Sequence, residues 1–199
     1  MKEWEAYNRA HELLAKAGLR DETIRSLERD FGYFNAPASK SHHLAVPGGL
    51  VRHSINVTER LVDLTNKLGV TWPRQESPYL VGMLHDIVKT RTYVADDEPP
   101  RTPTSTLPNG MAAQNTLKYK YVPATYGGHG AASAMLIMSN LGVFLNPAEA
   151  AAIRWHMGAF GLSGDELREY DCALDEYPLE LIATHTADML AARVDERGL

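Results

Sequence analysis

The sequence predicts a mostly α-helical bundle with one small inserted β-ribbon. Apolar residues recur every three or four positions over most of the chain, which is the spacing of amphipathic helices. Glycines, prolines and capping residues divide these stretches into separate helices. The segment from residue 90 to residue 127 differs, because its middle contains residues that interrupt a helix: Pro99, Pro100, Pro103 and Pro108. A chain of 199 residues suits one domain, covering residues 1–199.

Two helices are expected in the N-terminal residues 1–34. The first covers residues 3–17, ends at Gly18, and has an apolar stripe formed by Ala6, Ala10, Leu13, Leu14 and Ala17. Asp21 is a suitable N-cap for a second, shorter helix, whose apolar side carries Ile24, Leu27 and Phe31. The glycines and prolines between residues 32 and 49 predict a loop.

Further helices are expected on both sides of the insert. Before it lie helices at about 50–68 and 77–89, and the first has apolar residues with helical spacing at Leu50, Val57, Leu61, Leu64 and Leu68. After it, apolar spacing and capping residues predict helices at 129–141, after Asn146, after Ser163 and at 178–193. Within residues 90–127, β-prone flanks and the turn signal Asn109-Gly110 predict a β-ribbon.

Composition limits the classes of partner. No apolar run approaches the roughly 20 residues that cross a bilayer, and the polar N-terminus has no signal-peptide core, so no membrane partner is expected. The single cysteine, Cys172, cannot form a disulfide within the chain, which favours the cytoplasm. The net charge is −5 and there is no run of Lys or Arg. A small phosphorylated molecule is therefore a better partner than duplex nucleic acid.

Six ionisable residues lie on segments that are expected to face the core. They come from five different segments: His53, His85, Asp86, His129, His156 and Asp188. Burying such groups costs several kcal/mol unless they are paired or bind a metal. Each residue alone could be a hydrogen-bonded core histidine or a helix-face carboxylate. Together they can share a metal ion, and imidazole with carboxylate suits Mn, Fe, Zn, Co or Ni.

The motifs around these residues resemble one protein family. The stretches are Gly-Gly-Leu-Val-Arg-His at 48–53, Gly-Met-Leu-His-Asp at 82–86 and the distal Ala-Asp at 187–188. Their order resembles the HD superfamily of metal-dependent phosphohydrolases, which are helical domains. The stretches around His129 and His156 resemble members with extra histidines that hold two metals, and also the HD module of some 3′→5′ exoribonucleases. The resemblance covers about residues 35–195.

The resemblance implies two metal sites. The first ion would be held by His53, His85, Asp86 and Asp188. Asp86 would bridge to a second ion, held also by His129 and His156. Many two-metal members have His or Asp directly after the position of His156, but this chain has Met157, which leaves the second site with fewer protein ligands. Lys89 matches a lysine of many members and could contact a phosphate, or could lie in solvent at a helix end.

Other residues are candidates for substrate contacts. His43 precedes a Gly-Gly turn and could lie at the mouth of the site. His185 lies one helical turn before Asp188 and could support that ligand. Arg154 could bind phosphate or pair with a carboxylate. The ribbon tyrosines could stack on a base or pack the ribbon onto the helices: Tyr93, Tyr119 and Tyr121.

These features predict a phosphohydrolase that acts on a nucleotide or related phosphate ester. Asp86 and Lys89 are the expected catalytic residues, one or two divalent transition-metal ions are the expected cofactors, and a metal-activated water is the expected nucleophile. Both monoesters and diesters remain possible substrates. The alternative is a non-catalytic domain that binds metal or nucleotide for regulation. The ribbon begins beside Lys89 and returns at His129, so we expect it to lie near the site and to influence substrate choice.

Overall fold

The computed structural model describes residues 2–40, 44–95, 119–124 and 127–197. Within these ranges the protein is mostly α-helical with a small two-stranded antiparallel sheet, so the predicted class is confirmed. The helices before the sheet are α1 (Glu3–Lys16), α2 (Asp21–Arg29), α3 (Gly49–Leu68), α4 (Ser77–Leu84) and α5 (Lys89–Thr92). Those after it are α6 (His129–Ser139), α7 (Pro147–Arg154), α8 (Gly164–Glu176), α9 (Pro178–Leu190) and a π-helical turn, Ala191–Asp195.

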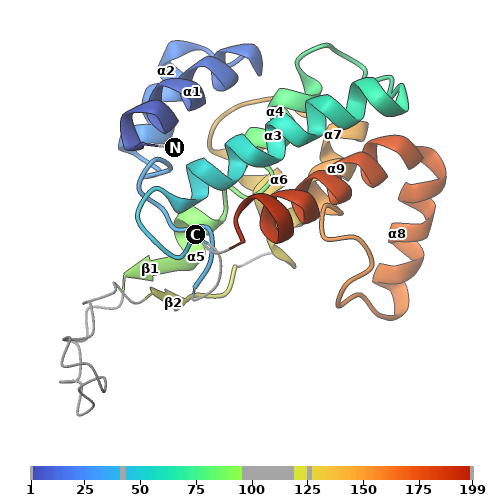
Figure 1. Ribbon diagram of the computed structural model, residues 1–199. Coiled ribbons are helices and arrows are strands. Elements are labelled where there is room, and N and C mark those ends of the chain that lie inside the picture. The colour runs from blue at the N-terminus through green and yellow to red at the C-terminus, as the bar shows by residue number, and fades with distance from the viewer. Residues whose placement is uncertain (1, 41–43, 96–118, 125–126, 198–199) are drawn as a thin grey trace.

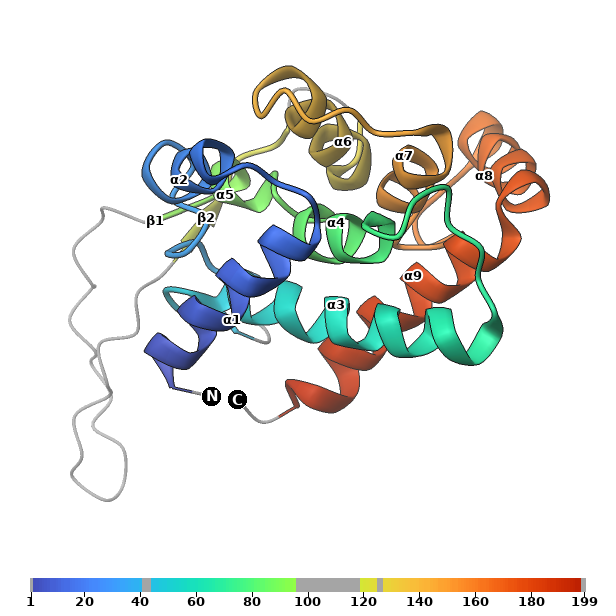
Figure 2. The ribbon, with the colours of Figure 1, turned by 90° about the horizontal axis from the view of Figure 1, so that it is seen from above.

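Helix α3 lies at the centre of the fold. It packs against α4, α9 and α1, while α6 packs against α7 (Figure 1). The view from above shows α1, α3 and α9 on one side of α4, and α6 and α7 on the other (Figure 2). The apolar stripe predicted on α1 is buried in this core, as are Ile24 and Leu27 of α2. Helix α8 has no buried residue and extends from the edge of the bundle.

Two glycines allow close helix contacts that bring distant segments together. A Cβ atom at Gly82 of α4 would lie 2.5 Å from Oγ1 of Thr58, so only glycine lets α4 approach α3 this closely. A Cβ atom at Gly130 of α6 would lie 2.3 Å from the carbonyl oxygen of Arg154 at the end of α7. Gly82 lies three residues before His85, and Gly130 directly follows His129; both histidines are predicted metal ligands. Close packing therefore fixes the distances between the segments that carry them.

The insert differs in part from its prediction. Strands β1 (Tyr93–Ala95) and β2 (Tyr119–Tyr121) pair antiparallel, with Tyr93 opposite Tyr121. The ribbon predicted within residues 90–127 begins later than its first residues, because Arg91 and Thr92 belong to the short helix α5. The residues between the strands, including the predicted turn Asn109-Gly110, lie outside the described ranges.

Two helix ends also differ from the sequence expectations. Asp21 is the first residue of α2 rather than its N-cap, since the cap position is Arg20. The helix expected at 77–89 ends at Leu84, and residues 85–88 form a turn before α5. The capping box predicted at Asn146 is confirmed, because its side chain accepts a hydrogen bond from the backbone N–H of Glu149.

Within the described ranges, no helix combines the length and apolar character that crossing a membrane requires.

Candidate metal centre

The structure brings all six predicted ligands into one buried cluster. Each comes from a helix or from the turn that ends one. His53 lies on α3, His85 and Asp86 lie in the turn after α4, and His129 is the first residue of α6. His156 lies in the turn after α7, and Asp188 lies near the end of α9. Five segments that are far apart in the sequence therefore contribute side chains to one place.

The first group of ligand atoms surrounds Oδ2 of Asp86. Nε2 of His85 lies 3.3 Å from this oxygen and Nε2 of His53 lies 3.6 Å from it. Oδ1 of Asp188 approaches the same two nitrogens, at 3.2 Å from His53 and 4.0 Å from His85. Two imidazoles and two carboxylates thus lie close together. His53, His85 and Asp86 form a group that could hold a metal ion, and Asp188 lies beside them.

The second group surrounds the other oxygen of the same carboxylate. Oδ1 of Asp86 lies 3.6 Å from Nε2 of His129 and 3.6 Å from Nε2 of His156. The two imidazole nitrogens are 3.0 Å apart. This set could also hold a metal ion. Asp86 therefore presents one oxygen to each pair of histidines, which is the arrangement of a carboxylate that bridges two ions.

The orientation of three imidazoles is fixed by contacts at their other ring nitrogen. Nδ1 of His85 lies 2.9 Å from the carbonyl oxygen of Gly82, and Nδ1 of His156 lies 2.7 Å from that of Ile153. A carbonyl oxygen only accepts, so Nδ1 carries the proton and Nε2 keeps its lone pair for a metal. Nδ1 of His53 lies 3.0 Å from a carboxylate oxygen of Glu196.

Two buried atoms of the cluster test whether a metal fits. Within the described residues, Nε2 of His85 and Oδ1 of Asp86 are buried and have no hydrogen-bond partner. Leaving such atoms unsatisfied costs about 1–3 kcal/mol each, so a ligand at this point is expected. Neighbouring ligand atoms at about 2.1 Å from one transition-metal ion are about 3.0–3.4 Å apart. The separations given above are close to this range, and the donor set suits such an ion.

Burial and neighbouring charges keep most of the predicted ligands in the deprotonated state that can bind a cation. Burial lowers the pKa of His156 to about 3 and also lowers the pKa of His129, so both rings are neutral at pH 7. Burial acts to raise the pKa of Asp86, but the charges of Lys89 and His85 hold it well below its usual value. Burial acts to lower the pKa of His53, but Asp188 and Glu196 outweigh it and raise the pKa to about 9.

Lys89 does not lie in solvent. Its ammonium group is 2.5 Å from Oδ2 of Asp86, and its side chain is only 14% exposed. Burial acts to lower the pKa of Lys89, but the charge of Asp86 outweighs it and raises the pKa. The lysine is therefore charged and lies at the edge of the first ligand group, where it balances a buried carboxylate.

The other predicted contact residues lie in different surroundings. Nδ1 of His185 is 2.8 Å from the carbonyl oxygen of His156, so His185 contacts the turn that carries this predicted ligand. The guanidinium group of Arg154 is exposed, pairs with Glu169 and lies 4.3 Å from the ring of Trp155. The pair with Glu169 is the kind of carboxylate contact that the sequence left open for Arg154. His43 lies outside the described residues.

Sequence reasoning missed Glu196. This carboxylate is 1% exposed and contacts both His53 and Asn56. It lies beyond the predicted last helix, in a segment with no apolar periodicity, so its burial had no signal in the sequence. Among the ribbon tyrosines, Tyr93 and Tyr121 contact each other across the two strands, with ring centroids 5.8 Å apart, and Tyr121 is exposed, whereas Tyr119 is buried.

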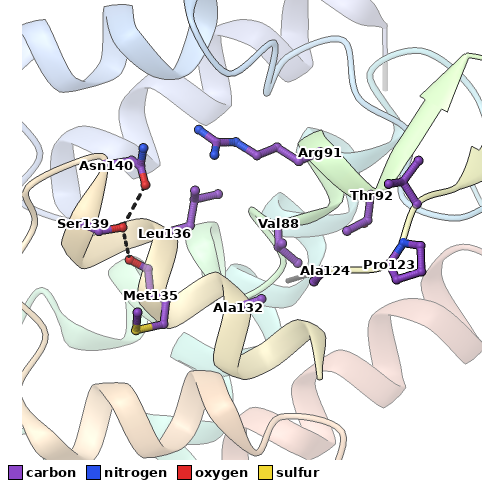
Figure 3. Close-up of a pocket in the computed structure, with 11 residues that line it drawn as sticks. Val88, Arg91, Thr92, Pro123, Ala124, Ala132, Met135, Leu136, Ser139 and Asn140 are labelled. Atoms are coloured by element: carbon purple, nitrogen blue, oxygen red, sulfur yellow. Dashed lines mark hydrogen bonds between the residues drawn. The ribbon is translucent and has the colours of Figure 1, made fainter. Parts of the chain in front are cut away.

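A cavity of about 480 Å³ adjoins the elements that carry the ligands (Figure 3). The segments on either side of the ribbon contribute to it, through Arg91 and Thr92 of α5 and residues 122–124 after β2. Helix α6 supplies a further wall, which includes Ala132, one turn after His129. Its lining contains none of the six ligands, so it lies beside the metal cluster and not over it.

Comparison with known proteins adds no family assignment. No protein-family model matches the chain, and no significant match was found among curated proteins or solved structures.

Proposed function

We propose that this protein is an HD-type metal-dependent phosphohydrolase that acts on a nucleotide or a related phosphate ester. The observation that carries the proposal is the position of Asp86. Its oxygen Oδ2 faces His53 and His85, and its oxygen Oδ1 faces a different pair, His129 and His156. A carboxylate placed in this way can bridge two metal ions, and two-metal sites recur in enzymes that cleave phosphate esters.

The residues divide into two roles. His53, His85 and Asp188 would hold one ion with Asp86, and His129 and His156 would hold the other with the same carboxylate. Divalent ions bound here would supply a water of lowered pKa as the nucleophile and would neutralise charge on the phosphoryl group. Lys89 would donate hydrogen bonds to a phosphate oxygen, since its charged ammonium group lies at the edge of the cluster.

The test begins with metal analysis of the purified protein and a panel of nucleotides and generic phosphate esters, assayed with Mn, Fe, Zn, Co and Ni. Metal-dependent phosphate release would support the proposal. Asp86→Ala should abolish both metal binding and hydrolysis. Asp63→Ala is the matched control, because Asp63 is an exposed carboxylate that pairs with Lys67 on the surface of α3. A variant at Asp86 that keeps full metal content and turnover would refute the proposal.

The same experiments address the regulatory alternative. A domain that only senses nucleotides would bind metal and nucleotide with no turnover on any substrate of the panel. Retention of bound nucleotide after long incubation with each metal, followed by chromatography of the unchanged ligand, would favour that function over hydrolysis.

A further inference from the structure

Glu196 connects the end of the described chain to the metal cluster. One of its oxygens lies 3.0 Å from Nδ1 of His53, and its other oxygen lies 3.3 Å from the same nitrogen. The first oxygen also accepts a hydrogen bond of 3.0 Å from the side-chain amide of Asn56. The side chains of Glu196 and His53 are 0% and 1% exposed. A buried carboxylate is thus held between two residues of α3.

The π-helical turn explains why Glu196 reaches His53. Asp188 faces His53 from α9, and a regular α-helix returns to nearly the same face after seven residues. That position would be Asp195. The turn Ala191–Asp195 has a wider hydrogen-bonding pattern, in which the N–H of Glu196 bonds the carbonyl oxygen of Ala191 five residues earlier. This pattern accommodates one extra residue and rotates Glu196 into the position beneath His53.

The neighbouring acidic residue makes a separate contact with the same helix. Both oxygens of Asp195 pair with the guanidinium group of Arg60, at 2.9 and 2.5 Å. His53, Asn56 and Arg60 share one face of α3, because they are three and four residues apart. The buried contact of Glu196 therefore reaches a metal ligand, whereas the more exposed contact of Asp195 reaches only an arginine.

We propose that Glu196 is a positioning residue for the metal centre, which orients His53 and strengthens it as a ligand through a carboxylate–histidine–metal arrangement. The inference rests on the proposed metal centre but not on hydrolysis. A carboxylate at Nδ1 keeps the proton on that nitrogen, fixes the ring plane and makes Nε2 a better donor to a cation. Loss of such a partner typically weakens metal binding by about 10- to 100-fold.

The experiment is a Co²⁺ titration of the full chain after removal of bound metal with a chelator. Glu196→Ala removes both contacts, and Glu196→Gln keeps the size and one acceptor oxygen but removes the charge. We expect Co²⁺ affinity to fall by about 10- to 100-fold in Glu196→Ala and less in Glu196→Gln. The visible absorption of bound Co²⁺ should also change, because this spectrum reports the ligand field. Asp195→Asn is the matched control and should leave affinity and spectrum unchanged.

A double-mutant cycle separates this role from a general effect on folding. In a His53→Ala background, Glu196→Ala should cause little further loss of Co²⁺ affinity, since the carboxylate acts through that imidazole. Equal losses in both backgrounds, or an equal loss in Asp195→Asn, would overturn the inference, as would wild-type affinity in Glu196→Gln and Glu196→Ala. Co²⁺ binding without hydrolysis would overturn only the proposed function. Absence of Co²⁺ binding to the wild-type protein would overturn both.

Discussion

The ammonium group of Lys89 lies 2.5 Å from Oδ2 of Asp86, the carboxylate oxygen that also faces His53 and His85. Lysine and aspartate are both largely shielded from water, so solvent and salt weaken their attraction little. Lys89 therefore balances the charge of Asp86 in the metal-free protein. A metal ion bound at this oxygen has to share it with the ammonium group or displace that group.

This competition predicts opposite effects of one substitution on binding and on turnover. Lys89→Met removes a positive charge next to the metal site, so we expect Co²⁺ to bind about tenfold more tightly. Hydrolysis should fall by about 10- to 100-fold, because a contact to the phosphoryl group is lost. Co²⁺ titration and steady-state turnover measure the two effects. Lys89→Arg keeps the charge and should retain near wild-type metal affinity. Weaker Co²⁺ binding in Lys89→Met would contradict the role given to this lysine.

The two groups of ligands predict a change in metal stoichiometry. His129→Ala should remove the ion held between His129 and His156 and leave the ion held by His53, His85 and Asp188. Metal analysis should then give one ion per chain, against the two that both ligand groups of the wild-type protein would hold when filled. Asp86→Ala should give none, because that carboxylate serves both groups. Equal metal content in His129→Ala and the wild-type protein would show that this imidazole is not a ligand.

The raised pKa of His53 predicts how metal binding depends on pH. Its pKa of about 9 means that the metal-free protein holds a proton on this ring at neutral pH. A metal ion has to displace that proton, so affinity should weaken about tenfold for each pH unit below 9. Because the pKa is raised, the same proton stabilises the metal-free fold below about pH 6.5, and this contribution is lost as the pH rises through 9. Titrations at pH 7, 8 and 9 measure the slope, and His53→Ala should flatten it.

The cavity beside the cluster predicts a residue that affects substrate affinity. Arg91 lines this cavity and is exposed, so its replacement should not disturb the core. With an anionic nucleotide as substrate, Arg91→Met should raise KM by about tenfold and leave kcat and metal content near wild type. Arg168→Met on α8 is the matched control, since it removes an exposed arginine from an element with no buried residue. Unchanged KM across the nucleotide panel would show that substrates do not use this cavity.

Much of the fold could be predicted because the helices obey local rules. The stripe of α1, the spacing on α3 and the capping box at Asn146 each depend on residues within a few turns, and each was confirmed. The six clustered residues were also recognisable, since charged and imidazole side chains on core-facing positions need a partner. Their type and inward placement indicated that they could share a metal, and the resemblance of the surrounding motifs to a known family implied how they divide between two sites.

The remaining features could not be predicted from the apolar spacing of the helices. Helix α4 ends at Leu84 because the carbonyl oxygen of Gly82 bonds the ring of His85 and the chain turns toward the cluster. The burial of Glu196 depends on a π-helical turn and on two residues of α3. Lys89 and Asp86 are only three residues apart, so their pairing is local, but the burial of this pair is not evident from helical spacing. Only the contacts of Glu196 join segments that are far apart in the sequence.

The contact between His53 and Glu196 joins residues that are 143 positions apart. Loop closure carries an entropic cost that has to be met before such a contact contributes, so non-local contacts slow folding. During synthesis, His53, His85 and Asp86 can meet while α3 and α4 pack, but Asp188 and Glu196 must first leave the ribosome. An ion held by His53 and Asp188 would then stabilise chains that have folded through to residue 196. Loading of that ion would follow these last tertiary contacts, and its presence would distinguish fully folded molecules from partly folded ones.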